Sequence, residues 1–157
     1  MYFPYLRGKQ FELLALRDFA TRFQNKEKVV PIIEPVKQQF GSLNTAISIM
    51  LREGLQFSII LNPKDGDFKH PNVNNDILGN LSSLVGVNDE WIPAYIYTRN
   101  ANVLLNHIIQ NHLQQVMIIL PNGADVNDEE LMDFLRNERV SYIVNGNNGN
   151  RSTRVRL

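Results

Sequence analysis

Six short apolar runs, separated by segments with helical spacing, restrict how this chain can fold more than any other feature. The runs occupy residues 1–6, 29–34, 57–61, 92–97, 116–120 and 140–145. Most are apolar without alternation, as in VVPIIE, FSIIL and VMIIL, which is typical of strands covered on both faces. Strands that alternate with helices predict a parallel sheet. We therefore predict an α/β domain whose parallel sheet has about six strands.

The segments between the runs have the apolar spacing of amphipathic helices. In the first segment, the spacing predicts one apolar face that is shared by Phe11, Ala15, Leu16, Phe19, Ala20 and Phe23. Such a face is expected to pack against the sheet, because a helix of a globular protein turns its apolar stripe towards the core.

Two architectures can accommodate these β/α units. One is an open doubly wound sheet, and the other is a TIM-like barrel, which needs eight units and about 200 residues or more. The chain has 157 residues, of which residues 146–157 form a flexible tail or the start of a sixth helix. We favour an incomplete TIM-like barrel in a single domain, residues 1–157, truncated from a longer barrel. Its open sheet edges would suit a protein partner or self-association.

Composition narrows the classes of function. The 16 basic and 16 acidic residues balance to a net charge of +0, so nucleic-acid or membrane-surface binding is not expected. The chain has no cysteine, which excludes disulfides, thiolate catalysis and cysteine metal sites. No apolar run approaches the roughly 18 residues of a membrane helix, and the N-terminus lacks a signal-peptide pattern. We predict a cytoplasmic protein.

Cations precede two of the predicted helices, although the start of a helix favours anions. Arg7 and Lys9 precede the first helix, and Arg99 precedes the fourth. A bound phosphate or carboxylate would account for them, so all three are candidates for anion binding. Two alternatives stay open for the first pair: an ion pair with Glu34 of the neighbouring strand, or a solvated turn.

Further polar residues follow the strands, where parallel α/β folds place their sites. Glu34 ends the second run and is the candidate general acid or base. The other candidates at strand ends are Lys37, Asn62, Lys64, Asp65, Asn122 and Asn145. His107 and His112 are off the spacing that shares a metal on one helix, and no phosphate loop or dinucleotide fingerprint occurs. We predict no metal and no cofactor.

The opening residues also resemble a bacterial family known as beta family proteins. The resemblance is carried by Tyr2, Pro4, Leu6, Lys9, Glu12, Ala15 and Leu16, and by residues 31–35. It implies a TIM-barrel-like fold of which this chain is the N-terminal half. Family members often carry Gly-Glu where this sequence has Phe11-Glu12. The resemblance implies no reaction, but relatives in phage-defence gene neighbourhoods would imply a role as an interaction partner.

Two functions follow from these observations. The first is a non-catalytic interaction or defence-associated module, which we favour because an incomplete barrel lacks part of its site. The second is an enzyme or binding protein for a ligand that bears a phosphate or carboxylate, bound at the strand ends. A convergent, partly buried polar cluster would favour the ligand-binding function. Scattered exposed charges with an apolar patch or an open edge would favour the interaction.

Overall fold

The computed structural model describes residues 1–69, 76–85 and 91–146, so the predicted tail lies outside the described residues except for Gly146. The strands are β1 (Tyr5–Arg7), β2 (Ile32–Glu34), β3 (Phe57–Ile60), β4 (Trp91–Ile96), β5 (Val116–Leu120) and β6 (Val140–Asn145). The α-helices are α1 (Gln10–Arg22), α2 (Gly41–Arg52), α3 (Ile77–Val85), α4 (Ala101–Gln110) and α5 (Glu129–Leu135). None of these described helices has the length and apolarity needed to cross a bilayer.

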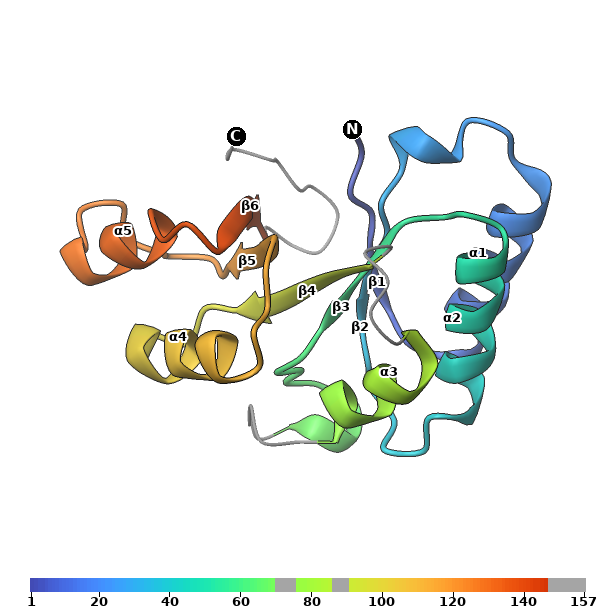
Figure 1. The fold of residues 1–157 in the computed structure, drawn as a ribbon, viewed down its shortest axis with the longest axis horizontal. Helices are drawn as coiled ribbons and strands as arrows, with labels where there is room; N and C mark the ends of the chain where they lie inside the picture. The colour runs from blue at the N-terminus through green and yellow to red at the C-terminus, as the bar shows by residue number, and fades with distance from the viewer. Residues whose placement is uncertain (70–75, 86–90, 147–157) are drawn as a thin grey trace.

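The strands form one parallel sheet in the order β1-β2-β3-β4-β5-β6 (Figure 1). Every pair of neighbours in the sheet is also a pair of neighbours along the chain, and all five pairings are parallel. The predicted α/β fold with a six-stranded parallel sheet is therefore confirmed. It arises because an amphipathic helix connects each strand to the next and returns the chain to the same end of the sheet.

The described helices all lie on one face of this sheet. Outward-facing strand residues such as Ile59 and Ile118 share a core with helix residues such as Leu43 and Leu104. In Figure 1 the helices surround the strands on the right, below and on the left. A doubly wound sheet would carry helices on both faces. The one-sided arrangement matches the barrel alternative instead.

The inner face of the sheet is buried because the sheet curls. Its residues, among them Ile60 and Met117, form a second core that contains strand and loop residues but no helix residue. Phe3, just before β1, and Tyr142 of β6 meet edge to face, with ring centroids 5.8 Å apart. No ladder joins β1 to β6 within the described ranges. The sheet is therefore not closed, but its two edge strands approach through side chains.

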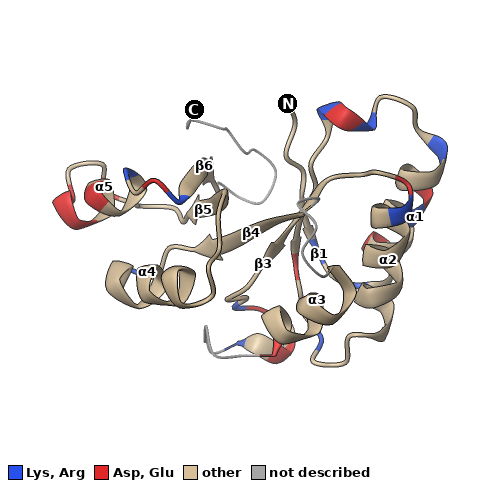
Figure 2. Cartoon of the chain, viewed as in Figure 1, with Lys and Arg blue, Asp and Glu red and all other residues tan. Residues whose placement is uncertain are grey.

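Charges of both signs are interspersed on the described surface. Figure 2 shows acidic residues on α5 and residues of both signs around α1 and α2. Exposed pairs within single helical turns join Arg22 to Asp18 and Arg136 to Asp133. Such exposed pairs contribute about 0–1 kcal/mol each, so they affect solubility more than the choice of fold.

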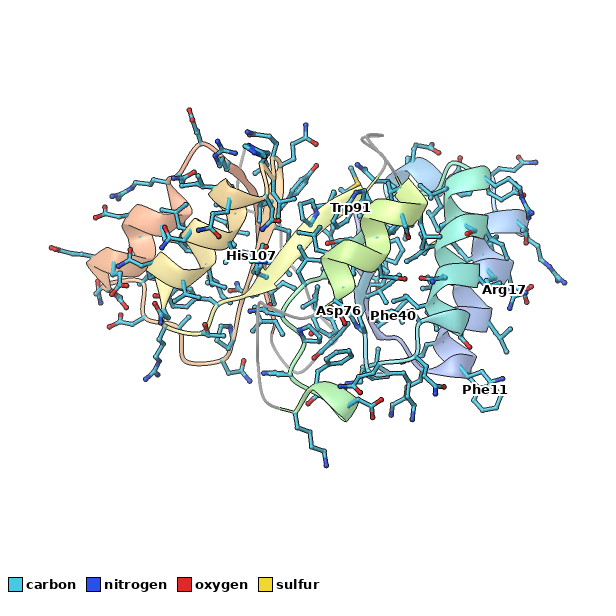
Figure 3. The ribbon with its side chains drawn as sticks, turned by 60° about the horizontal axis from the view of Figure 1, so that its bottom comes forward. Phe11, Arg17, Phe40, Asp76, Trp91 and His107 are labelled. Carbon is cyan, nitrogen blue, oxygen red and sulfur yellow. The ribbon has the colours of Figure 1, made fainter. Side chains whose placement is uncertain are left out.

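Helix α1 buries a narrower stripe than the sequence predicts. Its buried residues are Leu13, Leu16 and Ala20, whereas Phe11 is 83% exposed. Figure 3 shows the Phe11 side chain pointing away from the body of the protein. The prediction is wrong for Phe11, Ala15 and Phe23, which are exposed, because the segment carries two apolar stripes and can turn only one of them towards the sheet and α2.

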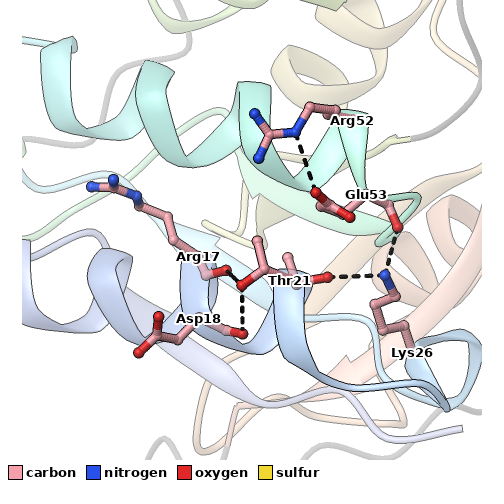
Figure 4. Close-up of polar contacts among 7 residues, drawn as sticks. Arg17, Asp18, Thr21, Lys26, Arg52 and Glu53 are labelled. Carbon is pink, nitrogen blue, oxygen red and sulfur yellow. Dashed lines mark hydrogen bonds and ion pairs between the residues drawn. The ribbon is translucent and has the colours of Figure 1, made fainter.

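Lys26 connects the carboxyl ends of α1 and α2 through two hydrogen bonds (Figure 4). Its Nζ donates hydrogen bonds to the carbonyl oxygens of Ala20, at 2.9 Å, and of Glu53, at 2.7 Å. Carbonyl groups at helix C-termini lack partners within the helix, and a cation there opposes the helix dipole. This contact holds α1 against α2, and thereby the two strands β1 and β2 that lie beneath them.

Candidate ligand site at the strand ends

Inward-facing residues at the carboxyl ends of the strands converge on one cavity of about 130 Å³. Its lining is Tyr5, Arg7, Glu34, Lys64, Asp65, Ile96, Ile119, Pro121 and Gly146. Side chains alternate along a strand, so Tyr5 and Arg7 both reach this inner face. All six strands, or the loops directly after them, contribute to the lining. The curl of the sheet thus gathers residues that are far apart in sequence.

Glu34 lies in this cavity as a buried carboxylate, 1% exposed. Its Oε1 accepts a hydrogen bond from the Tyr5 hydroxyl at 2.6 Å, and its Oε2 accepts one from the backbone N–H of Lys64 at 3.0 Å. Burial, and next the Glu34 carboxylate, raise the pKa of Tyr5 above the usual range of a phenol. Tyr5 therefore stays protonated and donates. Two neutral donors hold Glu34 in one orientation.

Arg7 pairs with Asp65 rather than with Glu34. Its Nη2 lies 3.1 Å from the Asp65 Oδ2, and the two side chains are 52% and 37% exposed. The predicted ion pair between Glu34 and Arg7 or Lys9 is wrong: the Tyr5 hydroxyl and the Lys64 backbone N–H each donate one hydrogen bond to Glu34, and no ion pair among the described residues contains it. An exposed pair of this kind contributes about 0–1 kcal/mol. Arg7 can therefore exchange Asp65 for another anion at little cost.

Two of the predicted site residues, Lys9 and Asn62, do not line this cavity. Lys9 is the exposed N-cap of α1 and is not among the residues that line the cavity. Asn62 is buried, and its Nδ2 donates to the Ile96 carbonyl at 2.8 Å while its Oδ1 accepts from the Ile96 N–H at 2.8 Å. The side chain of Asn62 thereby extends the pairing of β3 with β4. Its amide has a structural role and is not available to a ligand.

The remaining candidates lie apart from the central cavity. Lys37 lines a hollow of about 540 Å³ beside the first turns of α1 and α2. Arg99 and Asn122 line a third hollow, of about 460 Å³, together with Asp125. Asn145 is exposed at the end of β6. The structure thus brings Arg7, Lys64, Asp65 and Glu34 together, but it places Arg99 in a different hollow from Arg7.

Sequence reasoning missed Tyr5, although a signal for it was present. In the segment Phe3-Pro4-Tyr5-Leu6-Arg7, residues two apart share one face of a strand. Tyr5 must therefore accompany Arg7 to the inner face. Its pairing with Glu34 could not be predicted, because it depends on the lateral register that sets Arg7 opposite Glu34.

A second polar pair lies on the outer face, between β4 and α4. The Tyr95 hydroxyl is hydrogen-bonded to Nδ1 of His107, and the two rings meet edge to face. Burial raises the pKa of Tyr95 and lowers the pKa of His107. Both groups are therefore neutral at neutral pH, and protonation of His107 would place a charge in a partly desolvated position.

This pair predicts a loss of stability in mild acid. The unfolded chain takes up a proton on His107 near its usual pKa of about 6.5, whereas the folded state does so only at lower pH. The unfolded state then binds more protons, so this contribution is constant above about pH 6.5 and falls as the pH drops below that value. Melting temperatures measured from pH 7.5 to 5 should fall more steeply for the natural protein than for His107→Gln. Parallel curves would contradict the prediction.

No three His, Asp or Glu side chains in the described ranges lie close enough together to hold a metal ion. Comparisons of the chain with protein families, curated proteins and solved structures found no match, so the similarity of the opening residues to the beta family stays a prediction.

Proposed function

We propose that the chain binds a small ligand bearing a carboxylate or phosphate in the cavity at the strand ends. The observation that carries the proposal is the convergence there of Arg7, Lys64 and the buried Glu34 in a hollow lined from all six strands. Ligand sites typically combine apolar walls with a few convergent polar groups. Arg7 would bind the anion, and Glu34 is the oriented carboxylate available for proton transfer.

A matched pair of variants tests this proposal. Inorganic phosphate or propionate, at constant ionic strength, should raise the melting temperature of the natural protein, because a ligand that binds only the folded state stabilises it. Arg7→Ala should abolish the rise. Lys9→Ala removes the same charge two residues away, outside the cavity lining. This variant should retain the rise in melting temperature. Equal responses in the two variants, or no rise in the natural protein, would refute anion binding at Arg7.

A second function is supported by a separate surface, and we propose it as self-association. Within the described chain, the edge strand β1 pairs only with β2. The neighbouring helix α1 exposes Phe11, and also Phe23, which stacks on Phe19. An exposed apolar surface beside an open edge is typical of an interface. The sequence predicts an interaction or defence-associated module. Of the interactions such a module could make, this surface supports self-association.

Light scattering tests this second function. The natural protein should show a mass above that of one chain at high concentration. The double variant Phe11→Ser/Phe23→Ser should be a monomer, because it removes the two most exposed apolar side chains of α1 and its C-cap. Val126→Ser is the control, since Val126 is also an exposed apolar residue but precedes α5. A monomeric natural protein at every concentration would refute self-association.

A further inference from the structure

Within the described part of the chain, the buried carboxylate of Glu34 forms no ion pair. Both of its hydrogen-bond donors, the Tyr5 hydroxyl and the Lys64 backbone N–H, are neutral. A buried carboxylate is expected to have a cationic or metal partner. A carboxylate can accept about four hydrogen bonds, so each oxygen of Glu34 can accept one more.

A cationic group on the ligand would supply this partner. Glu34 lines the cavity, which makes the carboxylate accessible to a small molecule although it is buried from bulk water. An ammonium group donates up to three hydrogen bonds and could bond to both free acceptor positions. Aliphatic amines are protonated at neutral pH, as the lysine side chain illustrates.

An anionic position lies directly beside this cationic one. Arg7 and Glu34 are partners in the register of β1 and β2, and neighbouring strands are about 4.8 Å apart. Arg7 already binds a carboxylate, that of Asp65, in a half-exposed pair at the rim of the cavity. A ligand carboxylate can replace Asp65 there with the same charge and geometry, and a ligand phosphate can bind the arginine in the same bidentate manner with a larger charge.

From these two positions we infer that the ligand is a small zwitterion, an inference that rests on the proposed anion binding. Its ammonium group binds Glu34, and its carboxylate or phosphate binds Arg7 in place of Asp65. Because Arg7 and Glu34 line the same small cavity, a ligand that bridges them has its two charged groups only a few bonds apart. The cavity of about 130 Å³ limits the ligand to a few heavy atoms between its charged ends. Ile96 and Ile119 provide an apolar wall for the carbon atoms of that link.

Matched small molecules test the inference on the natural protein. Calorimetry would compare 3-aminopropionate with propionate, which lacks the ammonium group, and with propylamine, which lacks the carboxylate. A second pair, 2-aminoethyl phosphate and ethyl phosphate, distinguishes the two kinds of anion. We expect at least one zwitterion to bind tenfold or more tightly than its anionic analogue, and the amine alone to bind weakly.

Variants then assign the two ends of the ligand. Glu34→Gln should bind the zwitterion no more tightly than the anionic analogue, because the amide has no charge to attract the ammonium group. Asp65→Asn should tighten the binding of both, since it removes the competing carboxylate from Arg7. Lys9→Ala should leave all affinities unchanged. Circular dichroism would check that each variant is folded, and the ligand series on the natural protein needs no variant.

The possible outcomes distinguish the inferred zwitterion binding from the proposed anion binding on which it rests. If the anionic analogue binds as tightly as the zwitterion, anion binding stands and the zwitterion is refuted. If a zwitterion binds but Glu34→Gln, folded, retains the tenfold preference, the assignment of the ammonium group to Glu34 is refuted. If neither the zwitterions nor the anions bind, both the inference and the proposed function are refuted.

Discussion

Replacing Phe3 with alanine is expected to lower the free energy of unfolding by about 3–5 kcal/mol, as is typical for removal of a buried phenylalanine. Phe3 is 2% exposed and belongs to the inner core of the curled sheet. The substitution removes a ring that packs edge to face on Tyr142 and leaves a cavity between the two edges of the sheet. Urea denaturation, followed by circular dichroism, measures the effect.

Two further variants show whether this loss of stability arises from the contact between the β1 and β6 edges of the sheet. A double-mutant cycle of Phe3→Ala with Tyr142→Ala should give a coupling of about 0.5–1.5 kcal/mol, the usual range for an aromatic pair. Phe11→Ala, measured in dilute solution, removes the same ring from an exposed position and should change the stability by less than about 0.5 kcal/mol. A vanishing coupling would mean that the edges of the sheet do not meet.

Replacing Asn62 with aspartate is expected to lower the free energy of unfolding by at least about 2 kcal/mol. The two side chains have nearly the same shape, so packing is preserved. The carboxylate cannot donate to the Ile96 carbonyl, however, and it places two acceptors face to face in a buried position. The junction between β3 and β4, which holds one wall of the cavity, should be weakened. Thermal and urea denaturation at neutral pH measure the loss.

The same change at an exposed position is the control for this prediction. Asn145 lies exposed at the end of β6, so Asn145→Asp alters the net charge equally without removing a buried donor. Its effect should remain within about 0.5 kcal/mol. If Asn62→Asp and Asn145→Asp had equally small effects, the buried amide would not be needed to extend the β3–β4 pairing.

The fold was predictable to the extent that local patterns determine it. Runs such as FSIIL, without alternation, correctly predicted parallel strands buried on both faces. The apolar spacing of the intervening segments correctly predicted one α-helix between each pair of consecutive strands. The sequence could not show what covers each face. One face is covered by helices and the other by the opposite side of the curled sheet. Both kinds of cover require an apolar strand, so the sequence of the strand is the same in either case.

Four charged residues of the candidate site were predictable from the sequence, but Tyr5 and the contacts among these residues were not. The rule that sites lie at the carboxyl ends of parallel strands selected Arg7, Glu34, Lys64 and Asp65, and all four line one cavity. The same rule also selected Asn62, which is structural, and Arg99, which lines another hollow. A strand end indicates the edge of the sheet at which a residue lies. It does not indicate whether the side chain reaches the inner face or bonds to a neighbouring strand.

The sequence by itself determined the order and type of the elements, because apolar periodicity depends on residues that are close along the chain. Only the tertiary structure decided which apolar stripe of α1 is buried and which carboxylate pairs with Arg7. Those choices depend on lateral distances between strands and on the curl of the sheet. The long Arg7 side chain reaches Asp65 beyond β2, whereas Glu34 accepts hydrogen bonds from the Tyr5 hydroxyl and the Lys64 backbone N–H. Such a choice among partners arises only when the strands are assembled.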